Sequence, residues 1–336
     1  MILGSRIRQW LKLARLQAGA ATAITSVFGA ILLMPKGDVK IIHLIILFII
    51  GLLYHFYGFV LNEYSDIEVD RFSKELSEKP LIKGTINKEH AKTASLIAIL
   101  IALLAAIVYF RSLYATLAFL LAIFFGGIYD FYGKKFFGAD FILGASIFFF
   151  CIFGALTVSS NLTPAVYLVA FLFFIQLAFQ TGVTGGMKDI PHDFLAKAKT
   201  SPVYLGCRVM GKNLMVTNNF RTYVILIKLV HTFAVFLPFL LILFELLDPP
   251  ILQLLILTPL ILLMWTSSIS AINQRVFDRT KLMIILGAHE IVTYPMVAIL
   301  IVGIIGFWYA LFLALFPIFW LPIFLFIIYG KFMPDV

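Results

Sequence analysis

Two groups of oxygen-bearing side chains stand out because their members are four residues apart. Asn62, Asp66 and Asp70 follow one apolar run, and Asp189 and Asp193 follow another. In an α-helix, residues at i and i+4 lie on the same face, so each group would present its oxygens in a row along one side of a helix. Carboxylates in that relation repel each other, and a cation should therefore compensate them.

The compensating cation could be a neighbouring lysine or arginine, which would make the two groups salt-bridged helix ends at a membrane surface. It could also be Mg²⁺, which takes octahedral oxygen ligands and keeps waters and substrate phosphates in its remaining positions. Because the pattern recurs at the ends of two separate apolar runs, it favours the metal. Both groups are predicted to be half-built sites that a phosphorylated ligand completes.

Basic residues that follow the two groups could bind the phosphate oxygens of such a ligand. They are Arg71, Lys79, Lys83, Lys134, Lys135 and Lys199. For each of them, the alternative is a charge that only orients the chain in the membrane. Tyr129 could contact phosphate or stabilise a carbocation, or it could belong to the aromatic belt at a membrane interface.

The elements that must position these side chains are membrane-spanning helices. Of the 336 residues, 62% are hydrophobic and 13% are charged, which is typical of an integral membrane protein and excludes an ordinary soluble domain. Ten apolar stretches approach the ~20 residues that cross a bilayer. They are 15–34, 41–61, 93–110, 113–129, 138–158, 163–184, 222–244, 251–272, 283–305 and 307–329. The predicted fold is an all-α, multi-pass membrane helix bundle that forms a single domain over residues 1–336. Pro295, Pro317 and Pro322 are expected to interrupt the last two runs.

The distribution of basic residues predicts the orientation of the chain in the cell membrane. With a cytoplasmic N-terminus, all but four of the lysines and arginines fall in or near cytoplasmic segments, as the positive-inside rule requires. The long polar segments 62–92 and 185–221, which hold the acidic groups, are then cytoplasmic. This topology accounts for the net charge of +9, so no nucleic acid partner is expected.

The motifs resemble those of the UbiA-type family of membrane prenyltransferases over roughly residues 15–305. The first acidic group matches the family's Asn-x-x-x-Asp-x-x-x-Asp, and segment 79–86 matches the Arg-Pro-Leu-x-x-Gly-x-Ile that usually follows, with Lys79 in place of the arginine. The second group matches Asp-x-x-x-Asp followed by Lys-Ser or Lys-Thr, here Lys199 and Thr200. A tyrosine followed by basic residues after the fourth helix is matched more loosely by Tyr129, Lys134 and Lys135.

The resemblance implies a nine-helix core, so that 307–329 is either a tenth, C-terminal helix or part of a broken ninth. It also implies an enzyme, a prenyltransferase that transfers an alkyl group other than methyl. The catalytic residues would be Asp66, Asp70, Asp189 and Asp193, which with Asn62 would bind two Mg²⁺ ions. The residues that bind the substrate diphosphate would be Asn62, Arg71, Lys79, Tyr129, Lys134 and Lys199.

The implied donor is an isoprenyl diphosphate, such as geranyl, farnesyl or geranylgeranyl diphosphate, whose allylic C–O bond ionises. The prenyl group would pass within the membrane to an aromatic or lipid acceptor. Quinone precursors, haem, chlorophyll precursors and glycerol-phosphate lipids all serve as acceptors in the family, and the sequence leaves this choice and the prenyl length open. Membrane lipid is the expected surrounding, and the sequence gives no sign of an obligatory protein partner.

The alternative from another class is a multi-pass secondary transporter with a cytoplasm-facing acidic cation site. Transporter sites usually lie near the bilayer midplane at broken helices. The acids of this chain lie at the ends of apolar runs, which favours the enzyme. Three more residues have open roles. His289 and Glu290 could be structural or part of an acceptor pocket. His55 is expected to be a packing histidine or to line the central cavity of the helix bundle.

Overall fold

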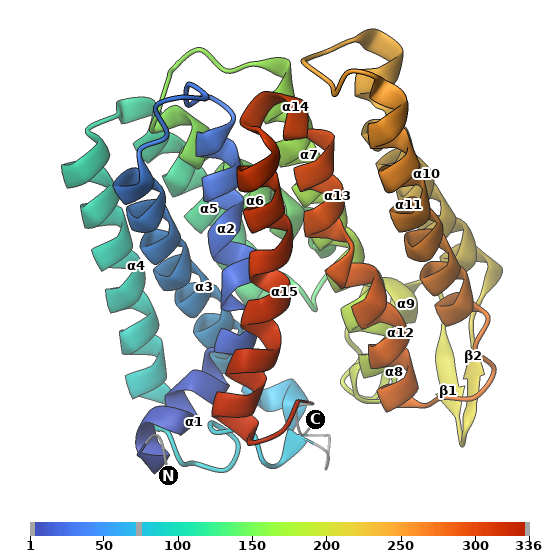
Figure 1. Cartoon of the computed structure of the whole chain (residues 1–336). Coiled ribbons are helices and arrows are strands. Elements are labelled where there is room, and N and C mark those ends of the chain that lie inside the picture. The colour runs from blue at the N-terminus through green and yellow to red at the C-terminus, as the bar shows by residue number, and fades with distance from the viewer. Residues whose placement is uncertain (1–3, 72–75, 333–336) are drawn as a thin grey trace. The chain divides into compact units, whose positions relative to one another are not determined.

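The computed structural model describes residues 4–71 and 76–332 as helices joined by short connections, with one β-hairpin (Figure 1). The helices are α1 (Ser5–Leu13), α2 (Gly19–Ile31), α3 (Ile41–Asp70), α4 (Lys88–Phe110), α5 (Leu113–Tyr132), α6 (Ala139–Leu156), α7 (Pro164–Phe179), α8 (Gly186–Leu195), α9 (Ser201–Tyr204), α10 (Asn218–Leu241), α11 (Pro250–Ile272), α12 (Arg279–Ile291), α13 (Thr293–Leu300), α14 (Val302–Ile305) and α15 (Phe307–Tyr329). A 3₁₀ turn, η1 (Leu16–Ala18), precedes α2, and a π-helical turn, η3 (Gln180–Gly185), joins α7 to α8. The hairpin pairs β1 (Arg208–Met210) with β2 (Asn213–Met215).

Nine helices within the described residues are long and apolar enough to cross a membrane, so the all-α multi-pass architecture is confirmed. The first predicted run, 15–34, forms a shorter apolar helix, Leu16–Ile31. The last predicted run forms α15, a helix of its own and not part of a broken ninth. Polar segment 62–92 is helical up to Asp70 and again from Lys88, and its residues 72–75 lie outside the described chain.

The prolines near the C-terminus have different effects. Run 283–305 is divided among α12, α13 and α14, and Pro295 lies in the first turn of α13, where the missing N–H is not needed. Pro317 and Pro322 lie inside α15, which continues through both. The predicted interruption of run 307–329 is therefore wrong.

The chain folds into two compact units. The first comprises Met1–Phe131, Phe149–Leu162 and Leu315–Val336, and the second comprises Tyr132–Phe148 and Thr163–Ala314. In the first unit, α3 packs between α2 and α4. In the second unit, α7 packs against α10, and α11 packs against α12 and α13. The single domain expected from the sequence stays a prediction.

Glycines allow close helix packing in the first unit. A Cβ on Gly29 of α2 would collide with the carbonyl oxygen of Cys151 in α6, and one on Gly154 would collide with that of Ser26. Small residues at such crossings let helix backbones approach closely, as is common in membranes. The short α2 is thereby held firmly against α6.

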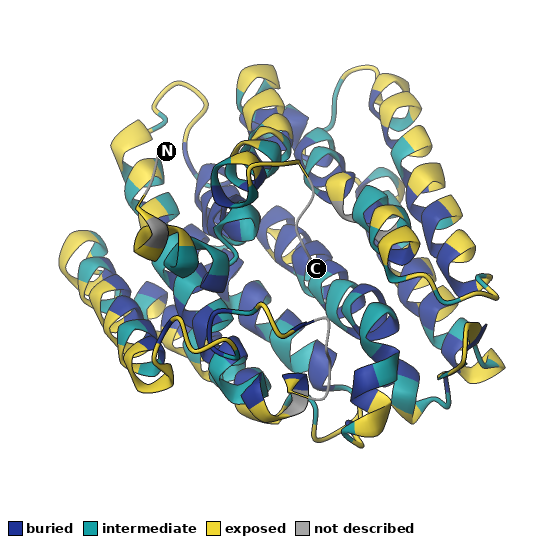
Figure 2. Cartoon of the chain, turned by 90° about the horizontal axis from the view of Figure 1, so that it is seen from below, coloured by how far each residue is buried: buried dark blue, intermediate teal, exposed yellow. Residues whose placement is uncertain are grey.

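Apolar side chains cover the exposed faces of the long helices. Leu100, Leu104 and Val108 of α4 are examples of exposed residues that repeat at helical spacing. Figure 2 shows individual helices with buried residues on one side and exposed residues on the other. A soluble protein rarely exposes so much contiguous apolar surface, whereas lipid tails make a suitable neighbour for these faces.

Candidate active site

The first acidic motif lies on the last turns of α3. This helix has 30 residues and continues beyond its apolar part to Asp70. Asn62, Asp66 and Asp70 therefore occupy successive i, i+4 positions on a helix, as predicted. Asp70 is buried, and the other two are half-buried.

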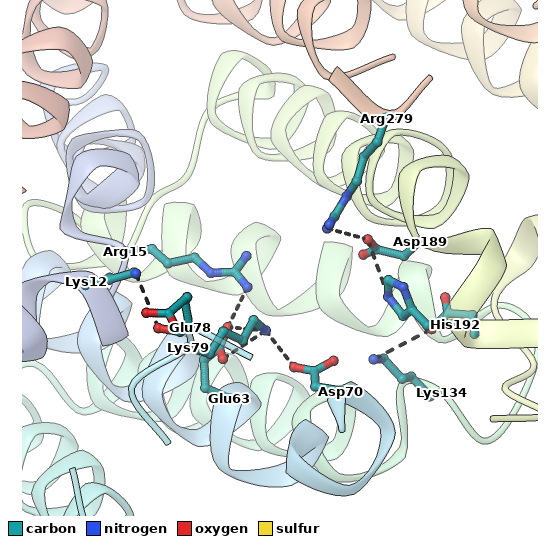
Figure 3. Close-up of polar contacts among 11 residues, drawn as sticks. Lys12, Arg15, Glu63, Asp70, Glu78, Lys79, Lys134, Asp189, His192 and Arg279 are labelled. Carbon is teal, nitrogen blue, oxygen red and sulfur yellow. Dashed lines mark hydrogen bonds and ion pairs between the residues drawn. The ribbon is translucent and has the colours of Figure 1, made fainter. Parts of the chain in front are cut away.

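Lys79 joins two buried carboxylates of α3 (Figure 3). Its Nζ lies 2.6 Å from Oδ2 of Asp70 and 2.9 Å from Oε2 of Glu63. On the other side of Glu63, Nη2 of Arg15 lies 2.5 Å from Oε1. The two cations offset the desolvation that these carboxylates would otherwise suffer. Lys79 thus lies at the first motif, where its partners are carboxylates, and its role in binding diphosphate stays a prediction.

The loop after α3 is shaped to place Lys79. The carbonyl of Pro80 accepts hydrogen bonds from the backbone N–H of Thr85 at 3.0 Å and from its hydroxyl at 3.1 Å. Gly84 between them has a φ of 74°, a conformation that favours glycine. Leu81 is buried in a small apolar cluster with residues of α3. Local turn chemistry and apolar packing thus bring the lysine back to the helix.

Two basic residues that follow the first motif in the sequence do not take part in the ion pairs with Glu63 and Asp70. Lys83 pairs with Glu78 at 2.5 Å, and both side chains are exposed. The hydrogen bond from Lys83, together with its charge, holds the pKa of Glu78 below its usual value. Arg71 is exposed at the end of α3 and forms no ion pair with another described residue. The phosphate-binding role of Arg71 stays a prediction.

The second motif lies on α8, which continues α7 through the π-helical turn Gln180–Gly185. Such turns occur as bulges within α-helices and are frequent at functional sites. A Cβ on Gly182 would collide with the carboxylate of Asp140, and one on Gly186 would collide with the ring of Pro202. The glycines of this turn therefore allow neighbouring segments to pack closely around the start of α8.

Asp189 is held by a cation from a distant helix. Nη2 of Arg279, the first residue of α12, lies 3.0 Å from Oδ1 of Asp189. Nε2 of His192 lies 3.5 Å from the same oxygen, one turn further along α8 (Figure 3). His192, which lies between the two motif positions in the sequence, thus contacts one of the motif carboxylates. The Asp189 side chain keeps 26% of its surface exposed, so it remains accessible.

Asp193 is buried, and Lys134 and Thr200 lie beside its carboxylate. Nζ of Lys134 lies 3.7 Å from Oδ1, and the hydroxyl of Thr200 donates to Oδ2 at 3.2 Å. The backbone N–H of Lys199 donates to the carbonyl of Lys134 at 2.8 Å, while the Lys199 side chain is exposed. The structure thus brings Lys134 and Thr200 to the second motif, with Lys199 beside them. Tyr129 is half-buried near the end of α5, in the other unit.

Sequence and structural comparisons agree on the family of this chain. A sequence model of the UbiA prenyltransferase family matches residues 22–276. The chain belongs to the UbiA prenyltransferase family. A search among functionally curated proteins finds no match. The resemblance inferred from the motifs is confirmed, and the protein is an integral membrane protein.

Solved structures of UbiA homologues share the fold. A structure of digeranylgeranylglyceryl phosphate synthase has a TM-score of 0.64 at 18% identity, covering 90% of this chain and 100% of that one. A homologue from Archaeoglobus fulgidus bound to DMAPP and Mg²⁺ has a TM-score of 0.63 at 16% identity, covering 89% and 100%. A homologue from Aeropyrum pernix K1 has a TM-score of 0.58 at 16% identity, covering 86% and 99%.

The donor set of this UbiA chain fits Mg²⁺, because both motifs offer carboxylates and the first also offers the amide oxygen of Asn62. Over residues 4–71 and 76–332, no group of three His, Cys, Asp or Glu side chains is placed to hold an ion by itself. Mg²⁺ is usually held by one or two carboxylates together with waters and substrate phosphates. The motifs therefore suit an ion that arrives with a diphosphate.

Sequence reasoning missed three residues of these clusters: Arg15, Glu63 and Arg279. Glu63 carries a usable signal, because it is an acid at the end of a membrane span, where ionisable groups are functional suspects. Arg15 and Arg279 carry none, because their partners are distant in sequence and either looks like an ordinary cytoplasmic charge.

The polar residues deeper in the spans are buried among the helices of the second unit. The side chain of Lys228 hydrogen-bonds Nε2 of His289. On the other side of the same ring, Nε2 of Gln176 lies 3.4 Å from Nδ1 of His289. Nζ of Lys228 also lies 3.3 Å from the ring centroid of Phe179. The role of His289 stays a prediction, and the side chain of Glu290 lies outside what the structure describes.

His55, in the first unit, is fully buried. Its Nδ1 lies 3.0 Å from the hydroxyl of Thr22, and its Nε2 lies 2.9 Å from the carbonyl of Ala14. Both ring nitrogens therefore have partners within the fold. Of the two roles expected for His55, the structure favours the packing histidine.

Proposed function

We propose that this UbiA family member is a Mg²⁺-dependent prenyltransferase of the cell membrane that uses an isoprenyl diphosphate as donor. The observation that carries the proposal is the pair of acidic motifs, each at the end of a membrane-length helix and each with basic side chains against it. The A. fulgidus homologue is bound to DMAPP with Mg²⁺ in one structure and to GPP with Mg²⁺ in another, which supports the same donor class for this chain.

In this proposal, Asn62, Asp66, Asp70, Asp189 and Asp193 hold two Mg²⁺ ions and, through them, the diphosphate. When bound, the ions neutralise the charge that develops on the departing diphosphate. Lys79 and Lys134 already lie against motif carboxylates. When these carboxylates coordinate the metal ions, the two lysines would bind the non-bridging phosphate oxygens. Arg71, Lys199 and Tyr129 complete the set of diphosphate contacts.

The reaction breaks the allylic C–O bond, and the electron pair leaves with the diphosphate. A nucleophilic atom of the acceptor forms the new bond to the allylic carbon and then loses a proton. The aromatic and aliphatic side chains of the spans exclude water, which would otherwise capture the carbocation. Because the prenyl tail is as apolar as lipid, a site inside the bilayer suits it, and an aromatic or lipid acceptor would reach it from the membrane.

The proposed orientation places the N-terminus and both motifs on the cytoplasmic side. The supporting observation is that most lysines and arginines, including Arg15, Lys79 and Lys134, lie in the connections and helix ends on the side of the acidic motifs, whereas few lie in the opposite connections or within a span. Water-soluble isoprenyl diphosphates would then approach from the cytoplasm.

The test is to incubate the purified chain with Mg²⁺, allylic diphosphates of graded length and a panel of aromatic and lipid acceptors, and to identify products by mass. Asp66→Asn and Asp189→Asn should each abolish turnover, whereas Asp38→Asn, at an exposed acid in the connection between α2 and α3, should leave it unchanged. Retained turnover in both motif variants would refute the site. Mg²⁺-independent ligand binding without any product would favour the transporter.

A further inference from the structure

A third carboxylate lies beside the first motif, on a helix that does not carry the motif. Asp130 is near the C-terminal end of α5 and is only 7% exposed. Its carboxylate accepts a hydrogen bond from the side chain of Asn62, and it lies close enough to Asp66 for their charges to interact. All three residues belong to the first unit of the chain.

Asp130 has no cation of its own among the described residues. Oδ2 of its carboxylate is buried and has no hydrogen-bond partner, and among the described side chains Asn62 alone donates a hydrogen bond to this carboxylate. The nearby Glu63 and Asp70 are different, because Lys79 pairs with both. A buried carboxylate oxygen without a partner is costly, and the like charge of Asp66 adds to the cost. A divalent cation between Asp130 and Asp66 would relieve both penalties.

We propose that Asp130 is a ligand of the metal ion at the first motif, together with Asn62 and Asp66. The Asn62 side chain can donate to Asp130 only through its amide nitrogen, which leaves its carbonyl oxygen for the ion. Asp130 thus orients one ligand and supplies a second. Three oxygens from two helices would face the ion, and waters and diphosphate oxygens would fill the remaining positions. This inference rests on the proposed function, since it assumes a Mg²⁺ site.

The test measures metal binding without any reaction. The full chain is purified in lipid nanodiscs and titrated with Mn²⁺, a spectroscopic substitute for Mg²⁺, while free Mn²⁺ is followed by electron paramagnetic resonance. Asp130→Asn keeps the size of the side chain and removes its charge. Because loss of a carboxylate that binds or orients a metal ligand typically lowers metal affinity about 10–100-fold, we expect a loss of that order. Asp130→Glu keeps the charge and should retain tighter binding than Asp130→Asn.

The matched control is Asp140→Asn, since Asp140 is also a buried aspartate at a helix end but is hydrogen-bonded to Ser201. Its Mn²⁺ affinity should equal that of the unmodified chain. The inference is overturned if Asp130→Asn binds Mn²⁺ as tightly as the unmodified chain, or if Asp130→Glu and Asp130→Asn lose the same amount. If the unmodified chain binds no Mn²⁺ even in a titration with inorganic pyrophosphate present, the proposed function itself fails, and the two failures are thereby distinguished.

Discussion

The pairing of Lys79 with two buried carboxylates makes a strong prediction about stability. Lys79→Met keeps the length and apolar stem of the side chain but leaves Asp70 without this cation. Removing one partner of a buried ion pair typically destabilises a protein by about 3–5 kcal/mol. Lys79 is 18% exposed and Arg15 still pairs with Glu63. We therefore expect a loss in the free energy of unfolding just below that range, about 2–3 kcal/mol.

The free energy of unfolding can be measured by titrating the protein in mixed micelles with a denaturing detergent and following helicity by circular dichroism. Lys83→Met is the matched control, because its exposed pair with Glu78 should contribute little. Lys79→Met combined with Glu63→Gln should lose less than the sum of the two single variants. Equal stability of Lys79→Met and Lys83→Met would refute the buried ion cluster.

Three further predictions concern the second motif, helix packing and a thiol. Arg279→Gln should raise KM for the diphosphate, measured by initial rates. Arg221→Gln, at a half-buried arginine of α10 that hydrogen-bonds Asn273, should leave KM unchanged, and equal effects of the two substitutions would argue against a local role of Arg279. Gly29→Ala should lower the thermal unfolding temperature because its Cβ collides with α6, whereas Gly58→Ala, which meets no atom within 4 Å, should not lower it. Burial raises the pKa of Cys207, so alkylation of this thiol in the folded protein, followed by peptide mass, should begin at higher pH than in the unfolded chain; identical pH profiles would contradict its burial.

The sequence was sufficient for the parts of the fold that depend on local pattern. Apolar runs of membrane length fix where helices lie, and the i, i+4 spacing of Asp66 and Asp70 requires only that α3 continue past its apolar part. The effect of Pro295 could also be expected. The continuity of α15 through Pro317 could not, because packing of neighbouring segments can compensate a missing hydrogen bond in a membrane helix.

The partners of the acids could not be predicted, because they depend on contacts between distant segments. Arg15 is 48 residues from Glu63, and Arg279 is 90 residues from Asp189. Nothing in the local sequence distinguishes either arginine from the other basic residues of the same polar segments. Asp130 was missed for a related reason. It has no acidic neighbour at helical spacing, and it comes close to Asn62 and Asp66 only because α5 lies beside α3.

The bridge from Lys79 to Asp70 also bears on the order in which ligands bind. If Asp70 coordinates a metal ion as proposed, the ion competes with the Lys79 ammonium group for the charge of the same carboxylate and weakens the ion pair. The released ammonium group is then available to a phosphate oxygen. Metal and diphosphate should therefore increase each other's affinity, and thermodynamic linkage makes that effect equal in both directions. The Mg²⁺ concentration needed for half-saturation should fall as the concentration of diphosphate rises.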